Sequence, residues 1–227
     1  MSSAIVVLSG GLDSSVNLAM AKEEMNVKMA ITFDYGQRAV SKETRASRQL
    51  CAHYQIPHKI VPVPWIREFG KSALLDQSQS VPTHEVEIDD RSTSLKTATK
   101  VWVPNRNGIF LNIAAGWAEA MECEYIIPGF NKEEAATFPD NSMEFIQTLI
   151  ESFSYSTANQ VNVKCYTIQM MKTEIVSMAI QKKLPLEMLW PCYLDGDQWC
   201  GQCESCQRSK RAFKDNGLDL NVYFKHT

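Results

Sequence analysis

The sequence predicts an α/β fold in which helices cover both faces of a parallel β-sheet. Short β-rich runs alternate with helical patterns along the chain, and that order is typical of βαβ units. A turn with two glycines joins the first apolar run, residues 4–8, to a helical pattern over residues 12–21. A chain of 227 residues can bury a substantial core without disulfides. The simplest interpretation is therefore one main domain.

The alternation of strands and helices continues along most of the chain. Residues 71–100 interrupt it, because Ser, Thr and Gln are frequent there and residues 85–90 are acidic. We expect a long loop, either a lid that orders on binding and then resists proteolysis or a solvated connection. In order, the pattern predicts a strand at 4–8, a helix at 12–21, a strand at 29–33, a helix at 41–54, a strand at 60–63, a helix at 107–120, a strand at 125–127, a helix at 143–154, a strand at 161–168 and a helix at 173–183.

Composition and charge favour an enzyme that acts on a small molecule. The formal net charge is -3 and the sequence pI is about 5.8, whereas a nucleic-acid-binding domain usually carries a strongly basic face. No apolar run approaches the ~20 residues that span a bilayer, and the N-terminus lacks a signal-peptide pattern. We therefore expect a cytoplasmic protein with no nucleic-acid or membrane partner and with reduced cysteines.

The first strong motif is SGGLDSS at residues 9–15, between the first apolar run and the first helical pattern. Its two glycines allow a sharp turn and a close approach to a ligand, and the helix that follows presents unpaired N–H groups. Such a helix start favours a phosphate. The motif is neither a Walker loop nor a dinucleotide fingerprint. The alternative is an ordinary strand-to-helix turn that is capped by Ser9 or Asp13.

The second strong motif lies near the other end of the chain, where four cysteines have the spacing C-x7-C-x2-C-x2-C. Four thiolates this close predict a closed tetrahedral zinc site that leaves no open position for chemistry, so the zinc is expected to be structural. An iron–sulfur cluster is the weaker alternative, because the ferredoxin spacing is absent. The other three cysteines are expected to pack in the core. The expected zinc ligands are Cys192, Cys200, Cys203 and Cys206.

Motifs from residue 4 to about residue 213 occur in the order found in one family. SGGLDSS resembles the pyrophosphate-binding loop of the ATP pyrophosphatases, and the whole set resembles the 7-cyano-7-deazaguanine synthases, the QueC family of the queuosine pathway. The resemblance implies a Rossmann-like adenine nucleotide hydrolase (PP-loop) core at residues 1–185 and a small zinc-binding helical lobe at 186–227. The other matching motifs are FDYGQR at 33–38, VPNRN at 103–107, FPD at 138–140, KTE at 172–174 and the four cysteines.

The resemblance implies an ATP-dependent carbon–nitrogen ligase. In this family the carboxylate of 7-carboxy-7-deazaguanine is converted with ammonia to the nitrile, 7-cyano-7-deazaguanine, in two ATP-dependent rounds through an amide. The implied cofactors are ATP, Mg²⁺ and structural Zn²⁺, with free ammonia as the simplest nitrogen source. A homodimer is also implied. Trp190, Trp199 and Tyr193 are expected either at its interface or in a small core beside the zinc.

Roles for single residues follow from the same resemblance. Asp13, Arg106 and Lys172 are expected to be catalytic. Asp13 is either a Mg²⁺ ligand or a first-turn helix acid, and Lys172 offsets the charge of pyrophosphate. The expected substrate-binding residues are Arg106, Asn107, Phe138 and Asp140. The expected ATP-binding residues are Leu8, Ser9, Gly10, Gly11, Leu12, Asp13, Ser14, Ser15, Asp34, Tyr35, Gln37 and Arg38. Replacing Asp13 or Lys172 is expected to impair turnover more than folding.

Residues 136–142 depart most from the family pattern, because they read ATFPDNS where many members read SGYPDCR. This difference supports an alternative, a QueC-like adenylating enzyme that acts on another carboxylate, such as a deazapurine derivative or a protein-linked substrate. A tRNA-modifying pyrophosphatase would predict a basic face, an RNA-binding domain or a catalytic cysteine pair. A non-catalytic nucleotide-binding or zinc-scaffold protein is disfavoured by the intact SGGLDSS, Arg106 and Lys172, and ATP–pyrophosphate exchange tests it.

Overall fold

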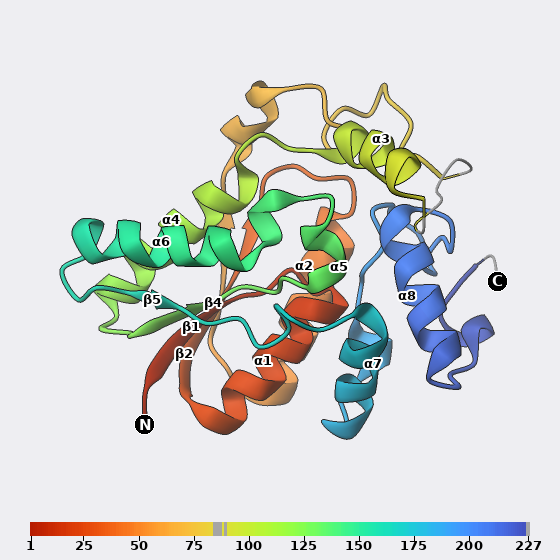
Figure 1. Ribbon diagram of the computed structural model, residues 1–227. Coiled ribbons are helices and arrows are strands. Elements are labelled where there is room, and N and C mark those ends of the chain that lie inside the picture. The colour runs from red at the N-terminus through yellow and green to blue at the C-terminus, as the bar shows by residue number, and fades with distance from the viewer. Residues whose placement is uncertain (84–87, 89, 226–227) are drawn as a thin grey trace.

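The computed structural model describes residues 1–83, 88 and 90–225, and over these residues it confirms the predicted α/β fold (Figure 1). Five parallel strands form one sheet in the order β3-β2-β1-β4-β5. The chain order reverses between β1 and β4, and such a reversal leaves a crevice at the carboxyl ends of the two strands. The strands are β1 Ser3–Val7, β2 Asn26–Asp34, β3 His58–Pro62, β4 Tyr125–Ile127 and β5 Asn162–Val163.

The central strand β1 is apolar on both faces because helices cover both. Ala4 and Val6 belong to one buried cluster, whereas Ile5 belongs to a second cluster on the opposite face. The run therefore shows no alternation of apolar and polar residues, as expected for a parallel strand inside a sheet. The first cluster includes residues of α1 (Leu12–Glu24), α2 (Val40–Tyr54) and α7 (Lys172–Gln181), and the second includes residues of α4 (Arg106–Ala120) and α6 (Met143–Ser156).

The loop expected over 71–100 is wrong in its last part, because helix α3 spans Arg91–Val101. Asp90 caps this helix by accepting a hydrogen bond from the Thr93 N–H at 2.7 Å. Ala98 and Val101 are buried, so tertiary packing outweighs the weak helix propensity of the Ser and Thr residues. Most of the acidic stretch 85–90 lies outside the described residues. The lid remains a prediction.

The strand expected over 161–168 is also wrong in its length, because β5 spans only Asn162–Val163. Polar side chains hold the rest of that segment against α1 instead of the sheet. The Tyr166 N–H donates to Asn17 Oδ1 at 2.7 Å, and Asn17 Nδ2 donates to Thr167 Oγ1 at 2.6 Å. The apolar periodicity of the segment gave no sign of these bonds.

The C-terminal residues form a lobe around helix α8 (Glu204–Asp215), which packs against α7 (Figure 1). Trp199 is buried there, and its ring lies 5.2–5.6 Å from those of Phe213, Tyr223 and Phe224. Trp199 thus belongs to a local core. The lobe and the α1 face of the sheet share one continuous apolar cluster, and the boundary at residue 185 stays a prediction.

The remaining described elements are short. None of the described helices combines the length and the apolarity that crossing a bilayer requires. These short elements are the 3-10 helix Pro64–Phe69, helix α5 at Lys132–Ala135, and the 3-10 helices Pro139–Asn141, Leu186–Met188 and Leu220–Val222.

Candidate active site

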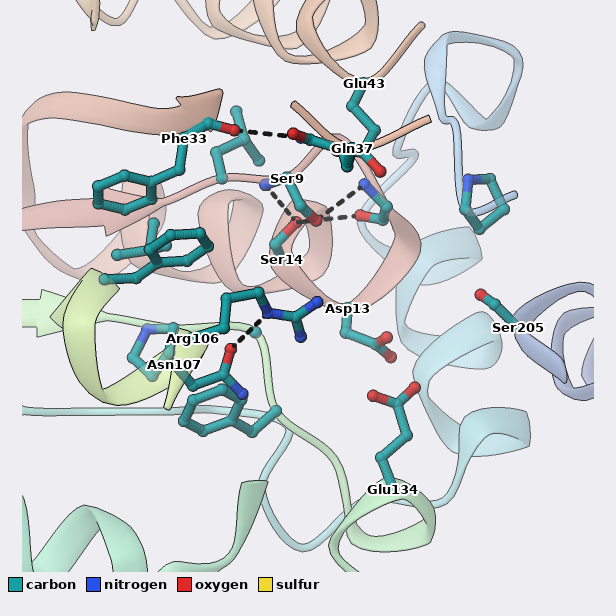
Figure 2. Close-up of a pocket in the computed structure, with 18 of the residues that line it drawn as sticks. Ser9, Asp13, Ser14, Phe33, Gln37, Glu43, Arg106, Asn107, Glu134 and Ser205 are labelled. Carbon is teal, nitrogen blue, oxygen red and sulfur yellow. Dashed lines mark hydrogen bonds between the residues drawn. The ribbon is translucent and has the colours of Figure 1, made fainter. Parts of the chain in front are cut away.

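A cavity opens at the carboxyl ends of β1, β2 and β4, where the strand order reverses (Figure 2). It brings together motifs that lie far apart in the sequence. Gly10, Ser15, Asp34 and Asp140 are adjacent in sequence to lining residues but do not line the cavity themselves. The predicted residues that line it are Leu8, Ser9, Gly11, Leu12, Asp13, Ser14, Tyr35, Gln37, Arg38, Arg106, Asn107, Phe138 and Lys172.

The SGGLDSS loop requires its first glycine. Gly10 has a φ of 81°, a conformation that favours glycine. A Cβ at this position would lie 2.8 Å from the Ala46 Cβ and 2.8 Å from the Glu43 carbonyl oxygen, so α2 packs directly on the loop. The Gly10 carbonyl accepts a hydrogen bond from the Trp190 N–H at 2.8 Å. The loop is therefore held between α2 and the segment that precedes the cysteine cluster.

Helix α1 begins at this loop without a side-chain cap. Neither Ser9 nor Asp13 caps it, so the alternative of a capped turn is wrong. The Ser14 and Ser15 hydroxyls donate back to the Gly11 carbonyl at 3.2 and 2.7 Å, and the Ser9 and Ser14 hydroxyl oxygens lie 3.0 Å apart (Figure 2). The first N–H groups of α1 are available to a phosphate at the cavity, while the hydroxyls bond within the loop.

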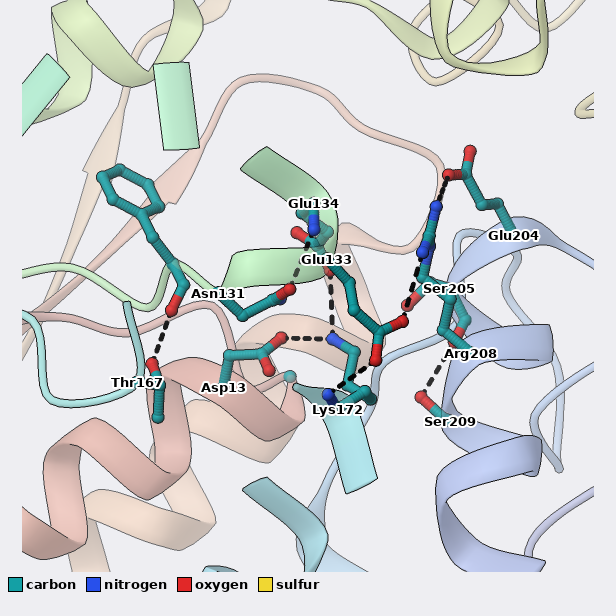
Figure 3. Close-up of polar contacts among 12 residues, drawn as sticks. Asp13, Asn131, Glu133, Glu134, Thr167, Lys172, Glu204, Ser205, Arg208 and Ser209 are labelled. Carbon is teal, nitrogen blue, oxygen red and sulfur yellow. Dashed lines mark hydrogen bonds and ion pairs between the residues drawn. The ribbon is translucent and has the colours of Figure 1, made fainter. Parts of the chain in front are cut away.

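Lys172 lies between two carboxylates at the edge of the cavity (Figure 3). Its ammonium donates to Asp13 Oδ2 at 2.6 Å and to Glu134 Oε1 at 3.0 Å. Lys172 is only 2% exposed, although it begins a helix. The three residues come from α7, α1 and α5, so the cluster joins the start of the chain to its last third.

Burial and mutual charge set the pKa values of this cluster. Burial opposes the charged form of Lys172, but Asp13 and Glu134 together raise its pKa above the usual value. Burial also raises the pKa of Asp13, and Lys172 offsets part of this effect. For Glu134, Lys172 outweighs burial and lowers the pKa. The Oδ1 atom of Asp13 is buried and has no hydrogen-bond partner among the described residues.

Arg106 begins α4 and points into the cavity (Figure 2). Its Nη1 donates to the Tyr35 hydroxyl at 3.3 Å, and its Nε donates to Asn107 Oδ1 at 3.3 Å. No carboxylate of the described residues forms an ion pair with it, while Asp140 acts on its charge from farther away. A half-buried guanidinium that is bonded only to neutral groups is a suitable partner for an anion.

The end of β2 forms a tight turn that its own side chains stabilise. Gln37 Nε2 donates to the Phe33 carbonyl at 3.1 Å, and Gln37 Oε1 accepts from the Tyr35 N–H at 3.1 Å. Asp34 Oδ1 accepts from the Gly36 N–H at 3.0 Å. Tyr35 and Gln37 line the cavity. The Asp34 carboxylate stabilises the turn through its bond to the Gly36 N–H.

Arg38 lies beside this turn, and its guanidinium binds backbone carbonyls. It donates from Nε to the Ala73 carbonyl at 2.7 Å and from Nη2 to the Asp76 carbonyl at 2.7 Å, with a further bond to the Gln79 carbonyl. In the structure Arg38 therefore holds the start of segment 71–83. Arg38 also lines the cavity and its Nη1 makes none of these bonds, so the ATP contact that the sequence predicts for Arg38 stays a prediction.

The FPD motif approaches the cavity from the side of α6. The Phe138 ring lines the cavity and stacks on Trp102, with ring centroids 6.1 Å apart and planes at 6°. The Asp140 carbonyl accepts from Asn107 Nδ2 at 3.4 Å, and its carboxylate accepts from Asn141 Nδ2 at 3.0 Å. Burial raises the pKa of Asp140, although Arg106 lowers it in part. Asn141, within the altered loop, lines the cavity.

Sequence reasoning missed many cavity residues, including two carboxylates and two residues of the cysteine lobe. Glu134 follows β4 closely, and the position of that strand next to β1 was the signal that could have identified it. Glu43 lies one helical turn into α2 and had no motif around it. Tyr193 and Ser205 flank the cysteine ligands Cys192 and Cys206, so the cysteine lobe supplies part of the cavity wall. These four missed residues are Glu43, Glu134, Tyr193 and Ser205.

Glu43 is a carboxylate with an unusual environment. Its Oε2 accepts from Gln37 Nε2 at 2.7 Å (the residues are labelled in Figure 2). Burial raises the pKa of Glu43 to about 7, against the opposing effects of Gln37 and Arg106. The carboxyl group therefore changes its charge near neutral pH.

We expect Glu43→Gln to change the pH dependence of stability. Folding raises the pKa of Glu43 from 4.5 to about 7, so its contribution to stability is full below pH 4.5 and is lost as the pH rises through 7. Glutamine resembles the protonated acid at every pH. Between pH 4.5 and about pH 8, the variant should therefore gain on the order of 2 kcal/mol relative to the unchanged chain. Urea unfolding of both proteins at several pH values measures this difference, and a constant difference would contradict it.

The four predicted zinc ligands converge. The Sγ atoms of Cys192, Cys200, Cys203 and Cys206 all lie within 4.8 Å of one another. Backbone N–H groups donate to these sulfurs, with Leu194 to Cys192 at 3.4 Å and Cys203 to Cys200 at 3.3 Å. Such N–H···S bonds stabilise thiolates and orient metal ligands. The cluster can therefore bind a metal ion.

The SGGLDSS loop before an uncapped helix start, at the reversal point of a parallel sheet, places the chain among the PP-loop nucleotide-binding α/β proteins. The family model described as "Queuosine biosynthesis protein QueC" matches residues 3–217. The chain belongs to the QueC family.

Curated relatives agree with this assignment, and a solved structure has a similar fold. The chain is 54% identical over 223 residues to the 7-cyano-7-deazaguanine synthase of Bdellovibrio bacteriovorus, covering 97% of this chain and 96% of that protein. It is 49% identical to the 7-cyano-7-deazaguanine synthase of Desulforamulus reducens, covering 98% of each. Its fold is similar to that of the U34-tRNA thiolase NcsA from Methanococcus maripaludis, with a TM-score of 0.50 at 16% identity, covering 94% of this chain and 67% of the thiolase.

Proposed function

We propose that this chain converts 7-carboxy-7-deazaguanine and ammonia to 7-cyano-7-deazaguanine in queuosine biosynthesis, as the names of its curated relatives indicate for those proteins. In the first round ATP adenylates the carboxylate, pyrophosphate leaves, and ammonia displaces AMP to give an amide. In the second round ATP adenylates the amide oxygen, and loss of AMP and a proton gives the nitrile. Each round needs one site for a phosphate chain and one for the group that is adenylated.

The environment of Arg106 supports this proposal most directly. Its guanidinium lines the same cavity as the uncapped start of α1, and its described hydrogen-bond partners are the neutral Tyr35 and Asn107. Adenylation joins a negatively charged acid to a negatively charged nucleotide, so a cation beside the phosphate site lowers the repulsion between them. We assign Arg106 to the substrate carboxylate.

The other predicted residues then have separate roles. Ser9, Ser14 and the first N–H groups of α1 hold the pyrophosphate that leaves, and Lys172 offsets its growing charge. Phe138 lines the cavity and stacks on the flat deazapurine. The hydrogen bonds from the base that the family resemblance implies for Asp140 would require its carboxylate to turn into the cavity, which it does not line in this structure.

We propose that Asp13 and Glu134 hold Mg²⁺. Hard carboxylate oxygens are suitable ligands, and Asp13 Oδ1 is a buried oxygen without a partner among the described residues. Glu134 also lines the cavity, so both carboxylates face the space that ATP would occupy. The bound ion would neutralise charge on the triphosphate.

We propose that the four cysteines hold zinc. A tetrahedral site with Zn–S bonds of ~2.3 Å separates its sulfurs by about 3.8 Å. Cys200 Sγ and Cys206 Sγ lie 3.8 Å apart. A four-iron cluster binds each thiolate through a different iron and therefore needs wider spacing. The zinc would be structural, because the cysteines complete its coordination.

The proposal also includes free ammonia as the nitrogen source, a homodimer as the assembly and the cytoplasm as the location. The nitrogen source and the assembly come from the family resemblance, and the location is the one expected for a biosynthetic enzyme of this family. Sedimentation analysis of the purified protein measures the assembly.

Mass spectrometry of the reaction products tests the proposed function. The zinc-loaded protein is incubated with 7-carboxy-7-deazaguanine, ammonium and Mg-ATP, and we expect the nitrile, AMP and pyrophosphate. Folded protein that binds ATP but forms neither amide nor nitrile would contradict the proposal. It would favour the second candidate, an adenylating enzyme for another carboxylate, which the altered loop at 136–142 and its cavity residue Asn141 support.

A further inference from the structure

Glu133 is a buried carboxylate outside the cavity that joins three helices (Figure 3). It is 7% exposed and lies in α5. Its Oε1 accepts from the Lys172 backbone N–H at 2.8 Å, at the start of α7. Its Oε2 accepts from Arg208 Nη1 at 3.2 Å and from Arg211 Nη2 at 2.5 Å, both in α8. No role in the chemistry described above requires these bonds.

Glu133 and its neighbour Glu134 hold Lys172 at two different points. Glu133 binds the backbone N–H, and Glu134 binds the ammonium. Two consecutive residues of one short helix thus fix both ends of the lysine. A change in the position of Glu133 would move the start of α7, and the ammonium would move with it relative to Asp13.

The arginines that bind Glu133 belong to α8, and two of the cysteines lie at the start of this helix. Cys203 is the residue before α8, and Cys206 lies in its first turn. Arg208 is 5% exposed and also binds Glu204 Oε1 at 2.9 Å. A fixed cysteine cluster therefore fixes the two arginines. An unbroken chain of bonds runs from the cysteines through α8 and Glu133 to Lys172.

We infer that Glu133 is a positioning residue for Lys172 and that the cysteine lobe acts on turnover through it. The buried arginines hold the Glu133 carboxylate, and the carboxylate holds the first N–H of α7. Together with Glu134 this keeps the ammonium beside Asp13. The inference rests on the proposed role of Lys172 in turnover.

The main test compares the substitutions Glu133→Ala and Glu133→Gln. Alanine removes all three bonds of the Glu133 carboxylate, and we expect turnover (kcat) to fall about 30-fold, because a small misplacement of a catalytic group is costly. The KM for ATP and the zinc content should stay within about twofold of their original values. Glutamine keeps an acceptor for the Lys172 N–H, so it should recover a large part of the lost turnover. If the alanine variant folds poorly, the turnover of the glutamine variant is compared with that of the unchanged chain instead.

A second measurement separates positioning from a general loss of structure. In a Lys172→Met background, Glu133→Ala should lower the residual turnover no further, because its effect runs through the lysine. Hydrogen exchange of the peptide that begins α7 should be faster in the alanine variant. Equal losses of turnover in both backgrounds, or unchanged exchange, would overturn the inference.

The control is Glu174→Gln. Glu174 is also a carboxylate at the start of α7, and its Oε2 accepts from the Met171 N–H at 2.7 Å, but none of its described bonds reaches α8. This change should leave turnover within about twofold. If Lys172→Met itself leaves turnover intact, the proposed role of Lys172 fails. If it lowers turnover and Glu133→Ala does not, only the present inference fails.

Discussion

Asp13→Asn is expected to lower turnover about 100- to 1,000-fold, because removing one preorganised electrostatic group commonly has an effect of this size. The substitution removes the carboxylate that faces the cavity and binds the Lys172 ammonium at 2.6 Å. Folding should change little. Lys172 keeps Glu134 as a partner at 3.0 Å, and burial already opposes the charged form of Asp13. Steady-state kinetics and thermal unfolding of the same preparation measure both effects.

A matched control is available on the same helix. Glu24 ends α1 and binds Lys164 at 2.8 Å, but this pair lies at the surface. Glu24→Gln makes the same chemical change and should leave turnover within about twofold. An Asp13→Asn variant that is as active as this control would show that Asp13 has no catalytic role. Replacement of Lys172 is expected to affect stability as well as turnover, because it leaves two half-buried carboxylates without the cation that lies between them.

Cys203→Ala is expected to have the largest effect on stability. It removes one of four converging thiolates, and the free energy of metal binding in such lobes is largely free energy of folding. We expect the zinc content to fall below half an ion per chain and the free energy of unfolding to fall by at least about 4 kcal/mol. Metal analysis and urea unfolding measure the two quantities.

Cys51→Ala provides the comparison for this loss. Cys51 is also buried, but it lies in α2, and burial raises the pKa of its thiol to about 12, so it stays neutral. Its replacement should cost roughly 1 kcal/mol and leave the zinc content unchanged. A Cys203→Ala variant that keeps its metal and its stability would rule out the four-cysteine site.

The fold was predictable where periodicity was strong and less so where polar contacts decided the structure. The run at residues 4–8 and the pattern at 107–120 agree with β1 and α4 because burial on the sheet dictates both. Helix α3 was missed because its Ser- and Thr-rich sequence has weak propensity and depends on packing. The end of β5 was missed because side chains of α1 take the bonds that a longer strand would have made.

The site was predictable to the extent that motifs mark it. SGGLDSS, Arg106 and Lys172 were identified from their motifs, and the structure brings them to one cavity. Glu43 and Glu134 were not identified, because only the packing of α2 and α5 around the loop gives these acids a role. Arg38 was identified from its motif and lines the cavity. The carbonyls that bind its Nε and Nη2 were not predictable, because they belong to segment 71–83, whose sequence has no clear periodicity.

The bond between the Gly10 carbonyl and the Trp190 N–H has a consequence for how the enzyme is made. The nucleotide loop lies near the start of the chain, but its partner leaves the ribosome some 180 residues later. Contacts between such distant residues form late, because a long loop must close first. A nascent chain therefore completes the packing around SGGLDSS and the wall of the cavity only when synthesis has reached the cysteine lobe.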